Sequence, residues 1–159
     1  MSTLNKKIVE SLSGLEQTVC TAESCTGGLI AASIVDVPGA SKILAGGIVA
    51  YMNTAKANVL GVNADVIERE TAVSEAVAVL MAEQARKKFG ADWAVAVTGY
   101  AGESGIDKSL DGVVYISVAG ADVLKCKKNI YNSDRNKARH LITEDALRML
   151  YDVITETEE

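Results

Sequence analysis

A strand, a tight turn and the start of a helix follow one another in Thr18-Val19-Cys20-Thr21-Ala22-Glu23-Ser24-Cys25-Thr26-Gly27-Gly28. Residues 18–22 are apolar or β-branched and predict a short strand. The small residues 24–28 end in two glycines and predict a turn, and a helix is expected over Leu29 to Val35. This strand–turn–helix unit is typical of α/β domains.

The rest of the chain continues the alternation of helices and strands. We predict helices over residues 4–15, 29–35, 54–60, 63–68 and 75–89, and from Ser133 or Asp134 to Ile154, with Asn53, Asn63 and Ser74 as N-caps. We predict strands over residues 18–22, 43–52, 93–98, 113–119 and 123–131, the last two as a hairpin across residues 120–122. We expect a single domain over residues 1–159, an α/β fold with a three-layer α/β/α sandwich and a mixed, mostly parallel sheet.

The composition excludes several classes of protein. Of 159 residues, 48% are hydrophobic and 23% charged, so the chain is not of the disordered class. A formal charge of −5 argues against general nucleic-acid binding, which normally needs a basic surface. No apolar run reaches the roughly 18 residues of a membrane span, and the N-terminus has no signal-peptide core. We expect a cytoplasmic protein that binds neither nucleic acid nor membrane.

The cysteines and the single histidine have no metal-binding spacing. Cys20, Cys25 and Cys126 form no CxxC pair, and His140 has no second histidine beside it. We expect no structural metal and no disulfide framework.

Three predicted loops follow strands, where ligands bind in α/β sheets. The first, residues 23–28, places Ser24 before a helix N-terminus whose free N–H groups suit an oxyanion or a phosphate. A serine at this position also commonly does no more than cap the helix. Cys25 is a competing nucleophile, with His140 as its only possible histidine partner.

The second loop, residues 51–56, offers a base for such a serine. If Asn53 caps the next helix, Lys56 is its third residue, where the helix dipole disfavours a cation. Partial burial would lower its pKa further, and a neutral lysine can take a proton from a serine nucleophile. Tyr51 could bring its hydroxyl to the same pocket. The alternative is that Lys56 extends to solvent and Tyr51 belongs to the core.

The third loop and a basic segment are weaker signals. Residues 98–105 are glycine-rich but match neither a P-loop nor a GxGxxG motif, so a flexible connection explains them equally well. Arg135 and Arg139 lie four residues apart near the start of the last helix and could bind an anionic group. An exposed helix face is the alternative.

Five segments together carry a resemblance to a known family: 21–28, 51–56, 60–62, 72–75 and 134–139. The chain resembles, over essentially its whole length, the CinA C-terminal domain family. This family comprises bacterial competence/damage-inducible proteins and nicotinamide mononucleotide deamidases. Full-length members carry a further N-terminal domain, so we expect a stand-alone version here.

The resemblance implies a hydrolase that converts nicotinamide mononucleotide to nicotinate mononucleotide and ammonia, without cofactor or metal. It implies roles for Ser24 as nucleophile, Lys56 as base and Tyr51 as a third group of the reaction. Backbone N–H groups near Thr26 and Gly27 are then expected to bind the oxyanion. Thr98, Gly99 and Gly102 would line the substrate pocket, and Arg135 or Arg139 would bind the phosphate. Family members are commonly homodimers or larger homo-oligomers.

The third loop departs from the family pattern. Tyr100 and Glu103 stand where the family usually has isoleucine and proline, and Leu110 and Asp111 replace a Lys-Pro pair. Two alternatives follow: a catalytically silent member that binds a nucleotide or a partner, and an amidase for a different, more cationic amide.

Overall fold

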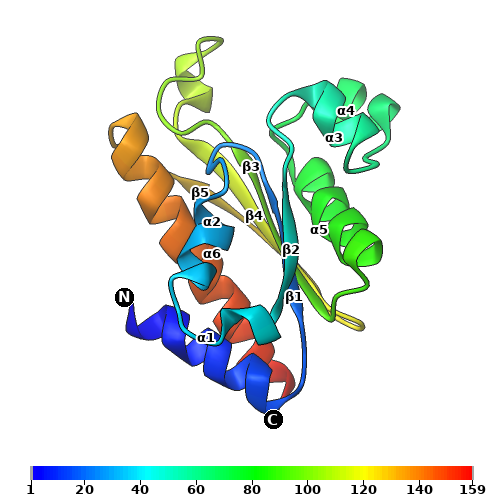
Figure 1. Cartoon of the computed structure of the whole chain (residues 1–159). Helices are drawn as coiled ribbons and strands as arrows, with labels where there is room; N and C mark the ends of the chain where they lie inside the picture. The colour runs from blue at the N-terminus through cyan, green and yellow to red at the C-terminus, as the bar shows by residue number, and fades with distance from the viewer. Residues whose placement is uncertain (1, 159) are drawn as a thin grey trace.

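The structure, a computed structural model that describes residues 2–158, has a five-stranded sheet between two layers of helices (Figure 1). The predicted three-layer α/β/α sandwich with a mixed sheet is therefore confirmed. The strands in chain order are β1 (Val19–Glu23), β2 (Leu44–Val49), β3 (Trp93–Gly99), β4 (Val113–Ala119) and β5 (Leu124–Ile130).

Strand order in the sheet is β2-β1-β3-β4-β5. Strand β1 pairs in parallel with β2 and with β3, and all five of its residues are buried. Strands β4 and β5 continue the sheet as the predicted antiparallel hairpin. Strand β4 alone runs opposite to the other four, so the sheet is mixed as predicted.

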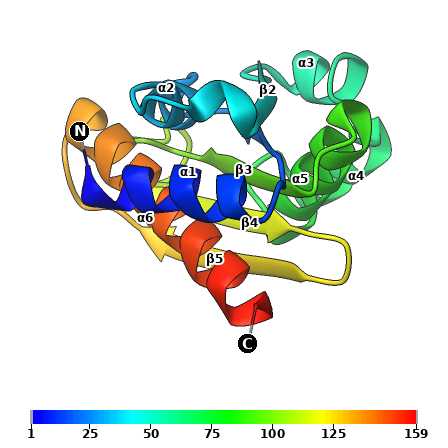
Figure 2. The ribbon, with the colours of Figure 1, turned by 60° about the horizontal axis from the view of Figure 1, so that its bottom comes forward.

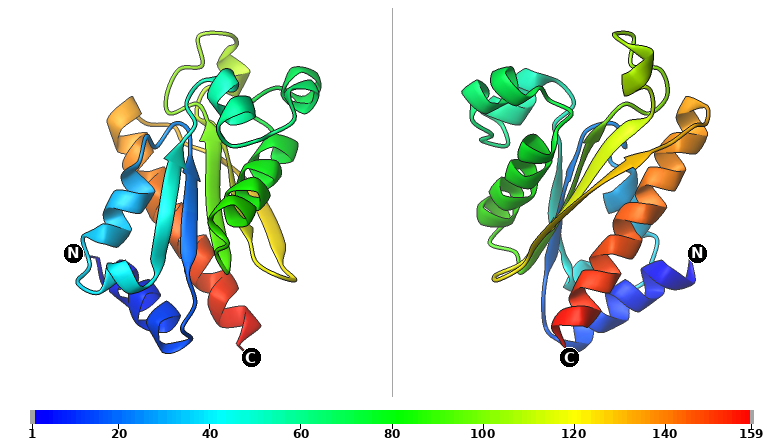
Figure 3. Two further views of the ribbon diagram at one scale, coloured as in Figure 1. Left: turned by 45° about the vertical axis from the view of Figure 1, so that its right-hand side comes forward. Right: turned by 180° about the vertical axis from the view of Figure 1, so that it is seen from behind.

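The helices divide between the two faces (Figures 1 and 3). One face is covered by α1 (Thr3–Gly14), α2 (Leu29–Val35) and α6 (Arg135–Thr157). The other is covered by α5 (Glu75–Phe89), and α3 (Asn53–Asn58) and α4 (Ala64–Glu70) lie beyond the N-terminal end of α5. The short 3-10 helices η1 (Ala40–Lys42) and η2 (Lys108–Leu110) complete the elements.

Alternate residues of the central strands enter the two cores. Val95 and Val97 of β3 belong to the core under α1, α2 and α6. Ala94 and Ala96 belong to the core under α5. This follows from the two-residue period of a strand.

Three helices begin at a predicted side-chain cap: α4 at Asn63, α5 at Ser74 and α6 at Asp134. Ser74 accepts a hydrogen bond from the Val77 N–H at 3.2 Å, and Asp134 accepts one from Lys137 at 3.0 Å. The predicted cap at Asn53 was wrong: Met52 has the extended backbone of the cap position and Asn53 is already helical. Lys56 is therefore the fourth residue of α3 rather than the third.

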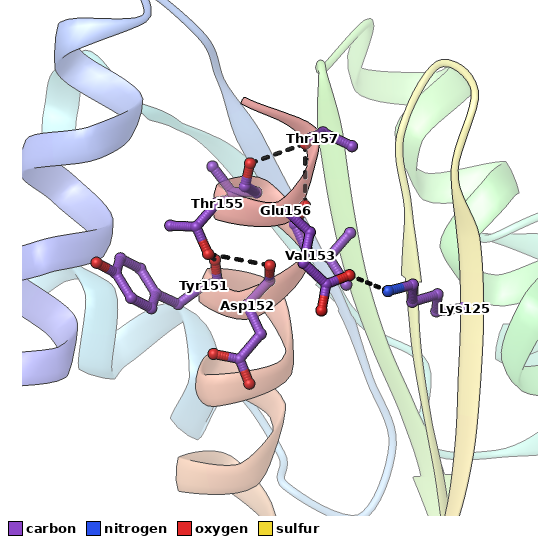
Figure 4. A network of polar contacts seen from close by, with 8 residues as sticks. Lys125, Tyr151, Asp152, Val153, Thr155, Glu156 and Thr157 are labelled. Atoms are coloured by element: carbon purple, nitrogen blue, oxygen red, sulfur yellow. Dashed lines mark hydrogen bonds and ion pairs between the residues drawn. The ribbon is translucent and has the colours of Figure 1, made fainter. Parts of the chain in front are cut away.

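Hydrogen bonds and one ion pair stabilise the C-terminal end of α6 (Figure 4), which lies at the opposite end of the sheet from the loops that follow β1, β2 and β3. The Thr155 hydroxyl donates to the Tyr151 carbonyl at 3.0 Å, and the Thr157 hydroxyl donates to backbone carbonyls one turn earlier. Lys125 of β5 forms an ion pair with Glu156. Helix α1 crosses α6 in the view of Figure 2 and packs against it. These contacts fix the C-terminal half of α6, and the N-terminal end of the same helix reaches the loops that follow β1 and β2.

The carboxyl ends of β1, β2 and β3 meet at one edge of the sheet because these strands are parallel. The connection from β1 to β2 passes through α2 on one face, and that from β2 to β3 passes through α5 on the other. A crevice opens beyond the strands where successive connections take opposite faces, and this is where open α/β sheets bind ligands.

Candidate functional site

Ser24 follows directly after β1 and is fixed by both neighbouring strands. Its N–H donates to the Val97 carbonyl at 3.1 Å, and the Glu23 carbonyl accepts from Ala50 at 2.8 Å. Ser24 is 7% exposed. The strand pairing therefore continues up to the proposed nucleophile and restricts its position.

Lys56, the fourth residue of α3, reaches Ser24 across the cleft edge. Its Nζ lies 3.0 Å from the Ser24 Oγ and donates at 3.0 Å to the Tyr51 carbonyl. Lys56 is 2% exposed, and this burial lowers the pKa of its ammonium group, because the charged form loses its hydration. The pair has the geometry that a serine nucleophile and a lysine base require.

Tyr51 contacts the pair through its backbone, not through its hydroxyl. Its side chain is 53% exposed, and its hydroxyl accepts a hydrogen bond from the Arg135 Nη2 at 2.7 Å. Arg135 is the first residue of α6, so this bond joins the β2–α3 loop to the start of that helix. The Tyr51 side chain thus lies where it can orient Arg135.

The N-terminus of α2 is occupied by the carboxylate of Glu23. This buried carboxylate accepts from the N–H groups of Ile30 at 2.9 Å and Ala31 at 3.1 Å, and from the Thr26 hydroxyl at 2.7 Å. These are the donors that were expected to be free for an oxyanion or phosphate. Nothing in the sequence distinguishes a buried capping Glu23 from a solvated one.

Two of the five N–H groups in the turn over residues 24–28 have an acceptor, those of Ser24 and Gly27. The Gly27 N–H donates to the Ser24 carbonyl at 3.0 Å. Among the described residues, the turn N–H groups of Cys25, Thr26 and Gly28 have no acceptor. Cys25 borders the cleft described next, whereas Thr26 is fully buried.

A cleft of about 700 Å³ opens over Ser24 and Lys56. Six residues singled out from the sequence line it: Ser24, Tyr51, Lys56, Thr98, Gly99 and Arg135. Four do not: Thr26, Gly27, Gly102 and Arg139. The cleft thus brings together the proposed nucleophile, its base and one arginine.

Arg139 lies behind the turn instead of in the cleft. Its Nε donates to the Cys25 carbonyl at 3.1 Å and its Nη2 to the Thr26 carbonyl at 2.9 Å. A Cβ added at Gly27 would lie 3.2 Å from the same Nη2. The two arginines, four residues apart on one helix, therefore have different surroundings.

Sequence reasoning missed several residues that line the cleft. Asn53, Glu68 and Thr71 come from α3, α4 and the segment before α5. Thr71 has a φ of +68°, which is uncommon for a residue other than glycine. The Thr98 hydroxyl, expected to face the substrate, donates to the Ala72 carbonyl at 2.7 Å and so holds this segment against β3. No sequence pattern marks these residues, because they come together only in the folded chain.

The third loop is ordered by its own hydrogen bonds. The Asp111 carboxylate accepts from the Ser104 N–H at 2.8 Å, and Asp111 does not line the cleft. Glu103 does line it. Of the two acidic residues considered from the sequence, only Glu103 therefore adds charge to the cleft.

The competing nucleophile Cys25 is unfavourably placed. Burial raises the pKa of its thiol to about 11, so the reactive thiolate is scarce at neutral pH. His140 is exposed on α6 and is not among the lining residues of the cleft. Within residues 2–158, no three His, Cys, Asp or Glu side chains lie close enough to bind a metal ion, and no helix is both long and apolar enough to span a membrane.

Similarity to known proteins agrees with this fold. The family model described as the CinA C-terminal domain matches residues 1–154. A putative competence-damage inducible protein of Halothermothrix orenii is 45% identical over 152 residues, which cover 94% of this chain and 37% of the relative. A CinA-like protein of Synechococcus is 41% identical, covering 90% of this chain and 35% of the relative. The chain thus spans less than two fifths of the length of these relatives.

Solved structures match over nearly the full chain. The competence/damage-inducible protein of Agrobacterium tumefaciens is 33% identical with a TM-score of 0.91, covering 96% of this chain and 93% of that one. The fold, the matched family model and the resemblance of the sequence motifs agree. The chain belongs to the CinA C-terminal domain family.

Proposed function

We propose that this chain hydrolyses the carboxamide of nicotinamide mononucleotide to give nicotinate mononucleotide and ammonia. The observation that carries the proposal is the buried Lys56 Nζ at 3.0 Å from the Ser24 Oγ. A lysine with a lowered pKa supplies the neutral amine that the reaction needs, and Ser24 has no histidine as an alternative base in the cleft.

The reaction proceeds in two halves through Ser24. Its Oγ attacks the carboxamide carbon while Lys56 takes the hydroxyl proton. Lys56 then returns that proton to the leaving nitrogen, the C–N bond breaks, and ammonia departs from an acyl-enzyme ester. Water attacks the ester, again giving a proton to Lys56, and this proton returns to Ser24 as the nicotinate product leaves.

Two negative charges need stabilisation during the reaction, that of the tetrahedral oxyanion and that of the phosphate. The tetrahedral oxyanion is stabilised by the Cys25 N–H beside the nucleophile, with the unpaired Thr26 N–H as its neighbour. The phosphate is bound by Arg135, which lines the cleft and is oriented by the Tyr51 hydroxyl. Thr98 and Gly99 form the floor of the substrate pocket.

Carboxylates in the cleft support a cationic substrate. Glu68 and Glu103 line it together with the single arginine Arg135. A pyridinium ring and a phosphate on one molecule match this mixture of charges. The same carboxylates favour the second candidate, an amidase for another cationic amide.

The test follows ammonia release from nicotinamide mononucleotide, with other pyridine nucleotides and simple amides as a panel. Ser24→Ala and Lys56→Met are each expected to lower kcat by at least about 10³-fold, because each removes a group that takes part in bond making. The exposed residues Ser109 and Lys42 provide matched controls, and Ser109→Ala and Lys42→Met should leave kcat unchanged. Full activity of Ser24→Ala would overturn the mechanism. Binding of the mononucleotide without turnover would assign the chain to a silent, ligand-binding role, and turnover of another panel member alone would assign the second candidate.

A further inference from the structure

The turn that carries the proposed nucleophile is held from two sides by opposite charges. On one side, the Glu23 carboxylate accepts hydrogen bonds from the Thr26 hydroxyl and from the N–H groups of Ile30 and Ala31 in α2. On the other side, the Arg139 guanidinium donates hydrogen bonds to the carbonyls of Cys25 and Thr26. The two side chains come from β1 and α6, so the turn is fixed between two elements far apart in sequence.

The Arg139 contacts determine the direction of N–H groups as well as of carbonyls. In a trans peptide, the C=O of one residue and the N–H of the next point in opposite directions. Holding the Cys25 carbonyl therefore directs the Thr26 N–H away from Arg139. Holding the Thr26 carbonyl does the same for the Gly27 N–H, which donates to the Ser24 carbonyl and closes the turn.

The hydrogen bond from the Gly27 N–H to the Ser24 carbonyl also fixes the orientation of the Cys25 N–H. The Ser24 carbonyl, held by Gly27, shares a peptide plane with the Cys25 N–H. The guanidinium of Arg139 thus orients in succession the peptides that follow Ser24. Arg139 itself does not line the cleft, and Gly27 packs against its Nη2.

From these contacts we infer that Arg139 is a positioning residue for the nucleophile turn and not a ligand for the phosphate. The inference rests on the proposed function for its kinetic consequences, but the contacts themselves stand without it. Arg135, one helical turn earlier, is then the only arginine of this pair that contacts substrate.

The kinetic test compares the same substitution at three arginines of α6. Arg139→Met is expected to lower kcat about 100-fold and to leave KM within about threefold, because a displacement of about 1 Å at reacting groups has an effect of this size. Arg135→Met should mainly raise KM. Arg148→Met, at an exposed position on the same helix, is the control. Arg139→Lys keeps one of the two donors and should have an intermediate kcat.

A second measurement does not depend on activity. Hydrogen exchange of the segment 24–31 is expected to be at least tenfold faster in Arg139→Met than in Arg148→Met. The Cys25 carbonyl loses its side-chain partner, and the Thr26 carbonyl keeps only the Leu29 N–H at 3.3 Å. If Arg139→Met does not fold, the exchange of the same segment is measured in Arg139→Lys, which keeps one of the two donors and should give an intermediate rate.

The outcomes separate this inference from the proposed function. Unchanged exchange in the segment 24–31, or a raised KM with normal kcat in Arg139→Met, would overturn the positioning role. If the wild-type protein releases no ammonia, the proposed function fails, and the exchange experiment still decides the role of Arg139.

Discussion

The turn at residues 24–28 and the loop at residues 100–112 lie at the same edge of the sheet but are held in different ways. The turn is bonded to β3 through Ser24 and to α6 through Arg139. The loop is held mainly by its own bonds, such as the Ser104 N–H to Asp111 and the Gly112 N–H to the Gly102 carbonyl. It projects beyond the sheet in Figure 3.

This difference matches two separate roles in the cleft: the turn positions the reacting groups, and the loop forms part of the lining. Reacting groups need positions accurate to a fraction of an ångström, and the turn obtains them from three separate elements. Among the loop residues that line the cleft, Tyr100, Glu103 and Leu110 are positions at which this chain departs from the motifs it otherwise resembles. Because the loop is held by local bonds, its residues can differ without disturbing Ser24 or Lys56.

The largest expected effect is on the turn. Glu23→Ala leaves buried N–H groups of Ile30 and Ala31 without an acceptor, so we expect the free energy of unfolding to fall by about 3 kcal/mol. Denaturant unfolding measures it. Glu83→Ala, at an exposed position on α5, should change stability by less than about 0.5 kcal/mol. Equal stability of the two variants would contradict the account of the turn.

An intermediate effect is expected from the cleft-facing part of the loop. Glu103→Gln removes a carboxylate without changing its shape. KM for nicotinamide mononucleotide, whose pyridinium ring is cationic, should rise about two- to fivefold, as for an exposed ion pair worth up to about 1 kcal/mol. Steady-state kinetics measures it, with Asp122→Asn in the β4–β5 turn as control. A lower KM would mean that the carboxylate repels the phosphate more than it attracts the ring.

The smallest effect is expected inside the loop. Asp111→Ala removes one partly exposed hydrogen bond to Ser104, and stability should fall by about 1 kcal/mol or less with kcat unchanged. Thermal unfolding and ammonia release measure both. A loss of kcat as large as that of Arg139→Met would show that the loop and the turn are not independent.

Periodicity and capping residues predicted most of the fold. The helices 29–35 and 75–89 have the predicted bounds, and Ser74 and Asp134 are caps, because these signals are local in sequence. Asn53 was wrong as a cap because the cap position also requires an extended backbone, and the extended residue directly before α3 is Met52.

The site was less predictable than the fold, since it depends on which atoms of each side chain and backbone group come into contact in the folded chain. Sequence spacing places Arg135 and Arg139 on one helix face, but their partners differ. Arg135 donates to the Tyr51 hydroxyl of the β2–α3 loop, and Arg139 donates to carbonyls of the turn. Likewise the spacing of Tyr51 and Lys56 suggested a hydroxyl near the amine, whereas the Tyr51 carbonyl makes the contact. Burial of Glu23 is a consequence of the tertiary fold and has no sequence signal.

The pH dependence of kcat tests the central claim most directly. Lys56 acts as a base only when neutral, and burial lowers its pKa. We therefore expect kcat to rise with pH through a midpoint below 10.5 and to level off above it. Lys56→Met should have no such rise and almost no activity. A midpoint at or above 10.5, or the same rising limb in Lys56→Met, would contradict the assignment of Lys56 as the base.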